Sequence, residues 1–538
     1  MFLGNYKPEL KTQISMSHSF SLANPDQNSL NTGQKISSAI GIIGLFLLFL
    51  LWYGSSSAQP ISVGASLALM IAGVLGYAWS TYASTPNGVK NNHVWQRGLT
   101  ARGLSAWLIG ILLTTFYVLL YWYPAMLGLA DSGAANTGLV SLFDPLSRWF
   151  KGQPASQWFV YGVLYTLAIV VFGLKFIWKY RGNRYQQFRT MSVMFFQAGF
   201  AFILPEIMQG LHLPYNDFKN MWPLNYYFFD EWHVKELTSS GNIGLFMLVF
   251  GIAMMVVVSP VLTYFYGKRW YCSWVCGCGG LAETAGDPFR QLSDKSTKAW
   301  KIERWLIHSV LVFALVMTVA VLFTLFQNNG DAFWIGKTLF VGIMTLILGI
   351  GGWLLWRNPK LINGLDPTAR RIGLWTVGIL LGLLWVAYAT GSSNILFFIS
   401  SYQLRDWYGF FIGAAFSGVI GVGFYPIFGS RVWCRFGCPM AAILGLQQKL
   451  FSRFRITTNG GQCISCGNCS TYCEMGIDVR SYAQKGQNIV RSSCVGCGVC
   501  SAVCPRGVLR LENADEDIFE RTTEQKVIQF IGGNPVIR

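Results

Sequence analysis

The chain has 538 residues, of which 52% are hydrophobic and only 12% are charged, and it contains 21 Trp and 39 Phe. A soluble protein of this length needs a more charged surface, so the composition excludes one and predicts that lipid is the solvent for most of the chain. The formal net charge is +17, but no basic run alternates with aromatic residues on a soluble surface. We therefore attribute the charge to membrane orientation and not to nucleic-acid binding.

The first segment, 1–36, lacks the basic start, apolar centre and small-residue cleavage site of a signal peptide, so we expect a polar cytoplasmic tail. Ten apolar stretches follow, each close to the ~20 residues that a membrane-spanning helix needs. They lie at 37–55, 60–81, 104–126, 158–178, 190–208, 243–266, 305–326, 333–356, 372–391 and 408–428. We therefore predict an all-α polytopic membrane protein of about ten transmembrane helices. The first five, at 37–208, form a membrane region without an assigned role.

The distribution of basic residues predicts which side each loop occupies. Lys and Arg concentrate in the segments on the same side of the predicted bilayer as the N-terminus. The positive-inside rule then places both termini in the cytoplasm of a cell with an inner membrane, where anionic lipid would face these cations. All thirteen cysteines fall in segments on this side. A reducing compartment keeps such thiols available for metal binding and not for disulfides.

The segment 209–242 is the longest on the opposite side, and we expect a periplasmic loop. Its Trp and Tyr residues are typical of an aromatic belt at the lipid head groups. A docking surface for a periplasmic partner, or a lid over a quinone site, is the alternative. Glu206, just before this loop, could take protons from a quinol. His308 is the one histidine in a predicted span, and we consider it either a packed polar residue or a quinone or proton contact.

Five cysteines follow two of the predicted helices. The runs GKRWYCSWVCGC at 267–278 and GSRVWCRFGCP at 429–439 both read Gly-x-Arg-x-aromatic-Cys-x3-Cys, so one small unit is repeated. Each pair supplies two ligands, and two pairs could close one tetrathiolate site, made of Cys272, Cys276, Cys434 and Cys438. A further iron–sulfur cluster is the preferred occupant, with structural zinc or unligated buried thiols as alternatives. Cys278 is either an extra ligand or an inert thiol. We expect Arg269 and Arg431, at matching positions, to offset the negative charge of such a site.

Two runs of four cysteines near the end of the chain share the spacing Cys-x2-Cys-x2-Cys-x3-Cys, and Pro505 follows the second run. This is the spacing of a bacterial two-cluster ferredoxin, in which the fourth cysteine of each run ligates the other cluster. The crossed sets for two [4Fe–4S] clusters are Cys463, Cys466, Cys469 and Cys504 for one, and Cys494, Cys497, Cys500 and Cys473 for the other. Zinc knuckles are the alternative, but they do not explain the repeated spacing. We expect a cytoplasmic α+β domain over 455–512 and a charged tail over 513–538.

Two Cys-x3-Cys motifs after transmembrane helices, followed by a two-cluster ferredoxin domain, resemble the membrane polyferredoxin family, which includes NapH, NosR and CcoG. The resemblance covers roughly 243–512 and implies a polyferredoxin membrane core over 243–450. It also implies that the eight ferredoxin cysteines and the four cysteines of the two pairs are cluster ligands. Two positions depart from the family pattern, because Gly277 follows Cys276 and Glu474 follows Cys473 where the family has proline.

The sequence favours a membrane-integrated iron–sulfur protein that passes electrons between ferredoxin-type clusters and a quinone or a partner redox subunit. It would then be a component of a quinone-linked oxidoreductase. The resemblance to CcoG allows a second hypothesis, a metal-reducing maturation factor for a respiratory enzyme. A third hypothesis is a membrane anchor whose clusters stabilise an assembly. The sequence does not determine the electron donor, the acceptor or the direction of electron flow.

Overall fold

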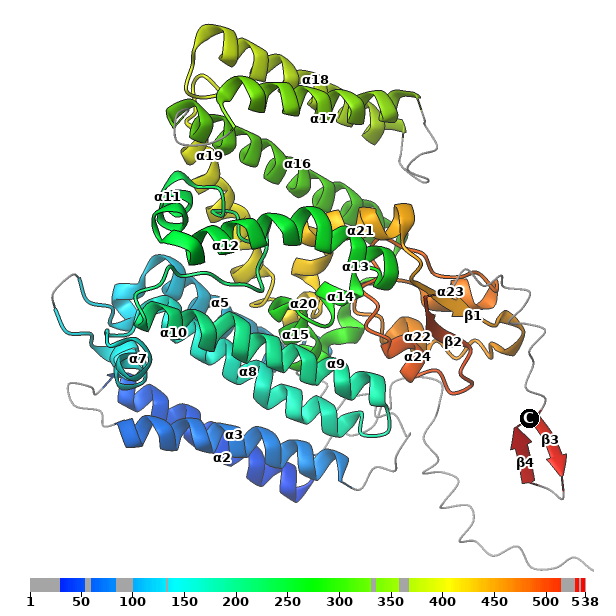
Figure 1. Cartoon of the computed structure of the whole chain (residues 1–538). Coiled ribbons are helices and arrows are strands. Elements are labelled where there is room, and N and C mark those ends of the chain that lie inside the picture. Colours follow the sequence, from blue (N-terminus) through cyan, green and yellow to red (C-terminus); the bar gives the residue numbers. More distant parts are fainter. Residues whose placement is uncertain are drawn as a thin grey trace, which may run out of the picture.

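The computed structural model describes residues 30–53, 60–83, 100–131, 134–329, 335–357, 367–513, 528–531 and 534–537 (Figure 1). Most of the two predicted tails, 1–36 and 513–538, lies outside these residues. The described part is mostly helical, with long helices side by side and a small domain containing strands at one end. This arrangement agrees with the predicted combination of a helical region and a C-terminal α+β domain.

Nine helices of the described residues are long and apolar enough to cross a membrane. They are α2 (Thr32–Tyr53), α3 (Pro60–Tyr82), α5 (Leu104–Trp122), α8 (Gln157–Lys179), the continuous helix of α9 (Arg184–Phe195), η2 (Phe196–Ile203) and α10 (Leu204–Gly210), the continuous helix of α12 (Gly241–Ala253), η3 (Met254–Val258) and α13 (Ser259–Tyr266), α16 (Thr297–Asn328), α17 (Lys337–Arg357) and α18 (Pro367–Thr390). Large apolar side chains such as Ile42, Phe246 and Trp375 are exposed on them, as expected where lipid covers a helix. α16 is the most buried of the nine.

Two of these helices contain a π-helical segment just before a proline. The segment η2 precedes Pro205 in α10, and η3 precedes Pro260 in α13. A proline ring clashes with the carbonyl of the preceding turn and lacks an N–H, so the wider π turn accommodates it without ending the helix. Pro124, in contrast, directly follows the end of α5 and begins the short helix η1 (Pro124–Leu127).

The tenth predicted span, 408–428, is not one long apolar helix. The chain forms α19 (Ser401–Tyr408) and the π-helical η5 (Gly409–Ile420), turns, and then forms the short α20 (Tyr425–Phe428). The start of this segment is polar, and Arg405 pairs with the buried Asp230 (Nε to Oδ2, 2.9 Å). The sequence prediction failed here because the apolar stretch itself contains a glycine-rich turn, after Ile420, that ends the helix.

The predicted loop 209–242 is not confined to the surface. Part of it turns back among the helices before it forms α11 (Glu231–Ser239). Met221 packs in the buried side-chain cluster that also holds the Cys-x3-Cys cysteines. Trp222 Nε1 donates a hydrogen bond to Thr318 Oγ1 (2.9 Å), well inside α16. Irregular backbone at membrane depth is tolerated where protein covers it, so this segment is part of the interior beside the cysteines.

The C-terminal domain is built on one antiparallel strand pair. β1 (Arg455–Thr458) pairs with β2 (Leu509–Glu512), so that Arg455 lies opposite Glu512 and Thr458 opposite Leu509. Four short helical elements lie between the strands: η7 (Gly460–Gln462), α22 (Asn468–Thr471), α23 (Val479–Gln484) and α24 (Val499–Ala502). A further hairpin is formed by β3 (Ile528–Ile531) and β4 (Asn534–Ile537). This order of short helices within a strand pair places both cysteine runs inside the domain.

Seven short elements of the described residues remain. They are α6 (Gly138–Ser141), α7 (Asp144–Lys151), α14 (Arg269–Cys272), α15 (Gly277–Thr284), η4 (Asp287–Leu292), η6 (Trp433–Gly437) and α21 (Pro439–Phe451). Figure 1 shows α14 and α21 beside the C-terminal domain, whereas α7 and α11 lie at the far end. The helices thus separate a cysteine-bearing end from an end without cysteines among the described residues.

Candidate iron–sulfur centres

Two matching glycines end the helices that precede the Cys-x3-Cys pairs. Gly267 follows α13 with a φ of 64°, and Gly429 follows α20 with a φ of 98°. A residue with a side chain is strained in this region, so both turns require glycine. The repeat in the sequence is therefore also a repeat in backbone geometry.

The second cysteine of each pair is held in the same way. The N–H of Cys276 donates to the carbonyl oxygen of Tyr271 (2.8 Å), and the N–H of Cys438 donates to that of Trp433 (3.0 Å). Each cysteine then stands at the N-terminus of a helix, α15 or α21, and the Cys438 sulfur accepts the N–H of Ala441 (3.4 Å). Helix N-termini stabilise negatively charged sulfur, so both positions suit thiolate ligands.

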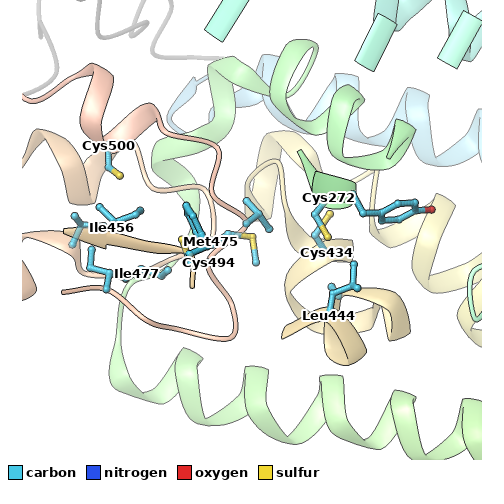
Figure 2. Close-up of a cluster of buried hydrophobic side chains, with 14 of the residues drawn as sticks. Cys272, Cys434, Leu444, Ile456, Met475, Ile477, Cys494 and Cys500 are labelled. Carbon is cyan, nitrogen blue, oxygen red and sulfur yellow. The ribbon is translucent and has the colours of Figure 1, made fainter. Parts of the chain in front are cut away.

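The structure brings the two pairs together. All four cysteines are buried in one side-chain cluster, and Figure 2 shows Cys272 and Cys434 next to each other. Burial raises the pKa of the Cys272 thiol to about 12. Burial, and then the charges of the other three thiols, raise the pKa of Cys438 far above its ordinary value. Four thiolates this close would repel one another in the bare protein, so the donor set fits a metal centre that binds thiolate.

Buried cations surround these thiols. Arg431 Nη1 lies 3.6 Å from the Cys434 sulfur and 3.3 Å from the carbonyl oxygen of Cys272. Burial lowers the pKa of Lys268, an effect opposed by the nearby thiols, among them Cys272 and Cys494. Lys219, from the segment that enters the bundle, contributes a third buried cation close to Cys276. An iron–sulfur cluster with four thiolates is negatively charged, so both the ligands and the surrounding charges fit one.

Arg269 does not repeat the role of Arg431. Its guanidinium lies over the ring of Phe454 (4.5 Å to the centroid) and donates to Asn513 Oδ1 (2.8 Å), so it covers the C-terminal domain. The expectation that both arginines offset the charge of the cysteine site is therefore wrong for Arg269. The adjacent Lys268 lies near the thiols instead.

The eight cysteines of the C-terminal domain form two groups that cross between the runs. Cys504, of the second run, lines one pocket together with three cysteines of the first: Cys463, Cys466 and Cys469. Cys473, of the first run, lies within electrostatic range of both Cys494 and Cys500 of the second run, and Cys497 and Cys469 also lie within range of Cys500. These groupings agree with the crossed sets that the spacing predicts, and the assignment of the eight cysteines as cluster ligands stays a prediction. We call the group with Cys504 the distal group and the group with Cys473 the proximal group.

The turns around the two groups repeat as well. Ser465 and Gly467 in the first run, and Gly496 and Gly498 in the second, have φ values of 58°, 82°, 62° and 74°. These residues flank the second cysteine of each run. A residue in the left-handed region on either side of the second cysteine bends the backbone around a common centre. The first three cysteines of the run, each separated from the next by two residues, can then all face that centre.

The proximal group faces the helical region. Side chains of that region donate to carbonyl oxygens of the second cysteine run: Ser273 Oγ to Val495 (2.8 Å), Tyr185 Oη to Gly496 (2.9 Å) and Gln186 Nε2 to Cys497 (2.8 Å). In Figure 2, Cys494 and Met475 lie between the pair Cys272 and Cys434 and the more remote Cys500. Cysteines of all three groups therefore belong to one continuous cluster of packed side chains.

Glu474, which stands where the family has proline, joins the C-terminal domain to this region. It is buried and pairs with Arg290 (Nη1 to Oε2, 3.0 Å) and Arg431 (Nε to Oε1, 2.9 Å). Burial alone would raise the pKa of this carboxyl, but the two guanidiniums outweigh burial and hold it below its usual value. Arg431 also pairs with Glu283, which in turn pairs with Arg189. Arg431 thus contacts both the Cys-x3-Cys site and Glu474.

Sequence reasoning missed most of this ion network. Glu474 was noted only as a departure from the family pattern, and Glu283, Arg290 and Lys268 were not singled out. The available signal was the presence of acidic residues on a side otherwise rich in Lys and Arg. Glu283, Glu474 and Cys497 offer ligand atoms within 4.8 Å of one another. Because arginines already neutralise both carboxylates, we assign this group to the ion network and not to a metal.

Cys278 and His308 both lie next to the Cys-x3-Cys site. A hydrogen bond between the Cys276 and Cys278 thiols lowers the pKa of Cys276 and raises that of Cys278. His308 lines a pocket of about 20 Å³ together with Cys434, large enough for one water. Its Nδ1 lies 2.6 Å from the carbonyl oxygen of Arg304 within the same helix.

Glu206 lies away from every cysteine group. It is on α10 and pairs with Lys151 of α7 (2.9 Å), at the far end of the bundle from the C-terminal domain (Figure 1). The structure therefore does not bring together His308 and Glu206, the two residues considered as quinone or proton contacts.

Comparisons with known proteins match three segments of the chain. A family described as a 4Fe-4S dicluster domain matches residues 455–505, and a family described as a 4Fe-4S binding domain matches twice, at residues 247–296 and 409–457. The chain carries iron–sulfur binding domains. The two matches of the second family contain the two Cys-x3-Cys pairs.

One curated relative is the "Putative electron transport protein YccM" of Escherichia coli (strain K12). It is 25% identical over 248 residues, which are 43% of this chain, and the match spans 65% of the relative's length. No solved structure matches the chain. These findings support the iron–sulfur part of the predicted resemblance, whereas the assignment to the NapH, NosR and CcoG family stays a prediction.

Proposed function

We propose that the protein transfers electrons between the cytoplasm and an acceptor in the membrane, either a quinone or a partner redox subunit. The observation that carries this proposal is the single buried cluster of side chains that includes cysteines of all three groups. An iron–sulfur cluster, when bound, supplies reversible one-electron chemistry. The chain supplies the thiolates, the hydrogen bonds and the low dielectric that hold such groups in series.

The order of the groups follows from their exposure. The distal group is nearest to the surface, where Ile464 is 52% exposed beside Cys463. The proximal group lies against the helical region, and the Cys-x3-Cys site lies beneath it. Electrons would therefore pass between a soluble partner at the distal group and a membrane acceptor near the Cys-x3-Cys site. The resemblance of the chain to YccM agrees with this proposal.

The proposed location is a bacterial inner membrane with both termini and the C-terminal domain in the cytoplasm. The basic residues Lys298, Lys301 and Arg304 begin α16 at the end that faces the C-terminal domain, as the positive-inside rule requires. A reducing cytoplasm also agrees with thirteen cysteines that form no disulfide.

Metal analysis of anaerobically purified protein tests the proposal. Three [4Fe–4S] sites predict about twelve irons and about twelve acid-labile sulfides per chain. EPR of the reduced protein should show interacting clusters. Zinc without sulfide, or fewer than about eight irons per chain, would contradict the proposal.

The rim of the distal pocket predicts the charge of the soluble partner. Arg480 and Arg506 line this pocket, and both are exposed. We expect the double variant Arg480→Glu/Arg506→Glu to slow reduction by an acidic soluble ferredoxin about tenfold or more at low ionic strength, and the difference to shrink in high salt. Stopped-flow absorbance measures this rate. Lys298→Glu/Lys301→Glu makes the same change in net charge elsewhere and should leave the rate close to wild type, whereas equal slowing would contradict a specific docking site.

A further inference from the structure

A large cavity lies among the first helices of the chain, in the region whose role the sequence did not assign. Its volume is about 690 Å³, and residues of α2, α3, α5, α8 and α15 line it. This volume is in the range of cavities that bind small molecules and cofactors. The cavity lies outside all three cysteine groups, but α15, which forms part of its wall, begins directly after Cys276.

One side of the cavity opens toward lipid. Ile42, Leu45 and Ile109 line the cavity, and all three are also exposed on the outside of the helices. The rest of this side is apolar, and α2 and α3 approach closely where Gly41 meets Gly73. A ligand that enters by this route must therefore be soluble in the membrane.

The other side of the cavity carries hydroxyl groups and adjoins the Cys-x3-Cys site. Tyr117, Tyr161 and Tyr165 line it, with ring centroids 6.3 Å apart for Tyr117 and Tyr161 and 5.2 Å apart for Tyr161 and Tyr165. All three lie within electrostatic range of Cys278. A Cβ added at Gly277 would lie 3.2 Å from the Tyr165 ring, so this ring packs against the backbone between Cys276 and Cys278.

Ionisable groups also lead from the cavity toward the C-terminal domain. Lys175 is buried and lines the cavity. One turn further along α8, Lys179 donates to Asp287 (Nζ to Oδ2, 2.5 Å), and Asp287 is bound by Arg290 as well (2.7 Å). Of these groups Lys175 lines the cavity itself, so its ammonium can donate a proton to a ligand in otherwise apolar surroundings.

We propose that this cavity binds the head group of an isoprenoid quinone, an inference that rests on the proposed electron-transfer function. The head group lies at the tyrosine side and the isoprenoid tail leaves between α2 and α5. Reduction of one quinone consumes two electrons, delivered singly from reduced iron–sulfur centres, and two protons, which form the two O–H bonds of the quinol. Oxidation of a quinol is the reverse. A side chain at Gly277 would collide with Gln197 Oε1 and Lys219 Nζ and would also crowd the Tyr165 ring, so the glycine keeps the cysteine loop packed against this side of the cavity.

Binding is tested on the full-length protein in nanodiscs of defined phospholipid that contain no quinone. A photoreactive azidoquinone should label peptides of α5 or α8, and excess decylubiquinone should displace it. Ala168 lines the cavity, so Ala168→Phe fills it and should lower labelling about fivefold or more. Leu174→Phe is the matched control, because Leu174 is on the same helix, outside the cavity lining and 44% exposed. Labelling that decylubiquinone does not displace, or that Ala168→Phe leaves unchanged, would overturn the site and point to a lipid-filled cavity.

A second variant and a second readout separate this site from the function on which it rests. Tyr165→Phe removes only a hydroxyl and should raise the decylubiquinone concentration for half-maximal displacement of the label severalfold without loss of iron, even if Ala168→Phe fails to fold. The dithionite-reduced, cluster-loaded protein should be reoxidised by decylubiquinone, and more slowly in both variants. Specific labelling without reoxidation would retain the binding site but refute quinone as electron acceptor. Reoxidation at wild-type rates in both variants would retain the function but refute this site.

Discussion

Replacing either Cys272 or Cys434 by serine is expected to remove one whole iron–sulfur cluster and to lower the iron content from about twelve to about eight per chain. The two residues stand at positions 272 and 434, yet they adjoin in the structure and share Arg431 as a neighbour. Because both are assigned to one centre, the double variant should lose no more iron than either single variant. The same EPR signal should disappear in all three proteins.

Cys278→Ser is the matched control for this experiment. Cys278 is in the same loop, and its thiol is hydrogen-bonded to that of Cys276, but it is not one of the four proposed cluster ligands. The control should keep about twelve irons and every EPR signal. If the Cys272→Ser and Cys434→Ser losses were additive, each pair would have its own metal. If the double variant kept all its iron, the site would bind no cluster at all.

The sequence was sufficient to predict the positions of the long apolar helices, because each helix is indicated by the hydropathy of its own residues. Nine apolar stretches coincide with nine described helices that are long and apolar enough to span a bilayer, and hydropathy measures that property directly. The tenth stretch was not predicted correctly because hydropathy gives no information about turns in the backbone. The turn after Ile420 ends the helix there, although the residues on both sides of it are apolar. The inward path of the segment around Trp222 was unpredictable for a related reason, since interfacial aromatics and buried aromatics have the same composition.

The cysteine sites could be anticipated to different extents. The crossed groups of the C-terminal domain follow from ligand spacing, because the geometry of a cluster imposes the intervals between its ligands. The approach of Cys272 to Cys434 was inferred from the internal repeat, from the common direction of the two preceding helices and from the charge count that places both pairs on one side. The structure shows matching turns at Gly267 and Gly429 in the two halves of the repeat. The difference between Lys268 and Arg269 at the site depends on tertiary packing, which a motif does not encode.

The second large effect is expected at Glu474, and it should change a reduction potential as well as stability. Glu474→Gln leaves Arg290 and Arg431 without their shared buried carboxylate, and breaking one side of a buried ion pair costs about 3 to 5 kcal/mol. The excess positive charge should raise the reduction potentials of the proximal group and of the Cys-x3-Cys site, because positive charge favours the reduced, more negative state. An EPR-monitored redox titration measures the potentials, and chemical denaturation followed by cluster absorbance measures the stability. Glu512→Gln is the matched control, since Glu512 accepts a hydrogen bond from Thr457 of β1 and lies outside the ion network described above.

Arg431→Gln distinguishes an electrostatic role of this network from a merely structural one. It removes a positive charge within 3.6 Å of the Cys434 sulfur, so the potential of that site should fall, opposite in sign to the change in Glu474→Gln. Loosened packing would expose the site to water in both variants and shift both potentials in the same direction. If the reduction potentials shifted in the same direction in Glu474→Gln and Arg431→Gln, or stayed equal to those of the Glu512→Gln control, the arginines and Glu474 would only hold the domain in place. Opposite shifts would show that the residue replacing the usual proline connects the charge balance of two electron-transfer centres.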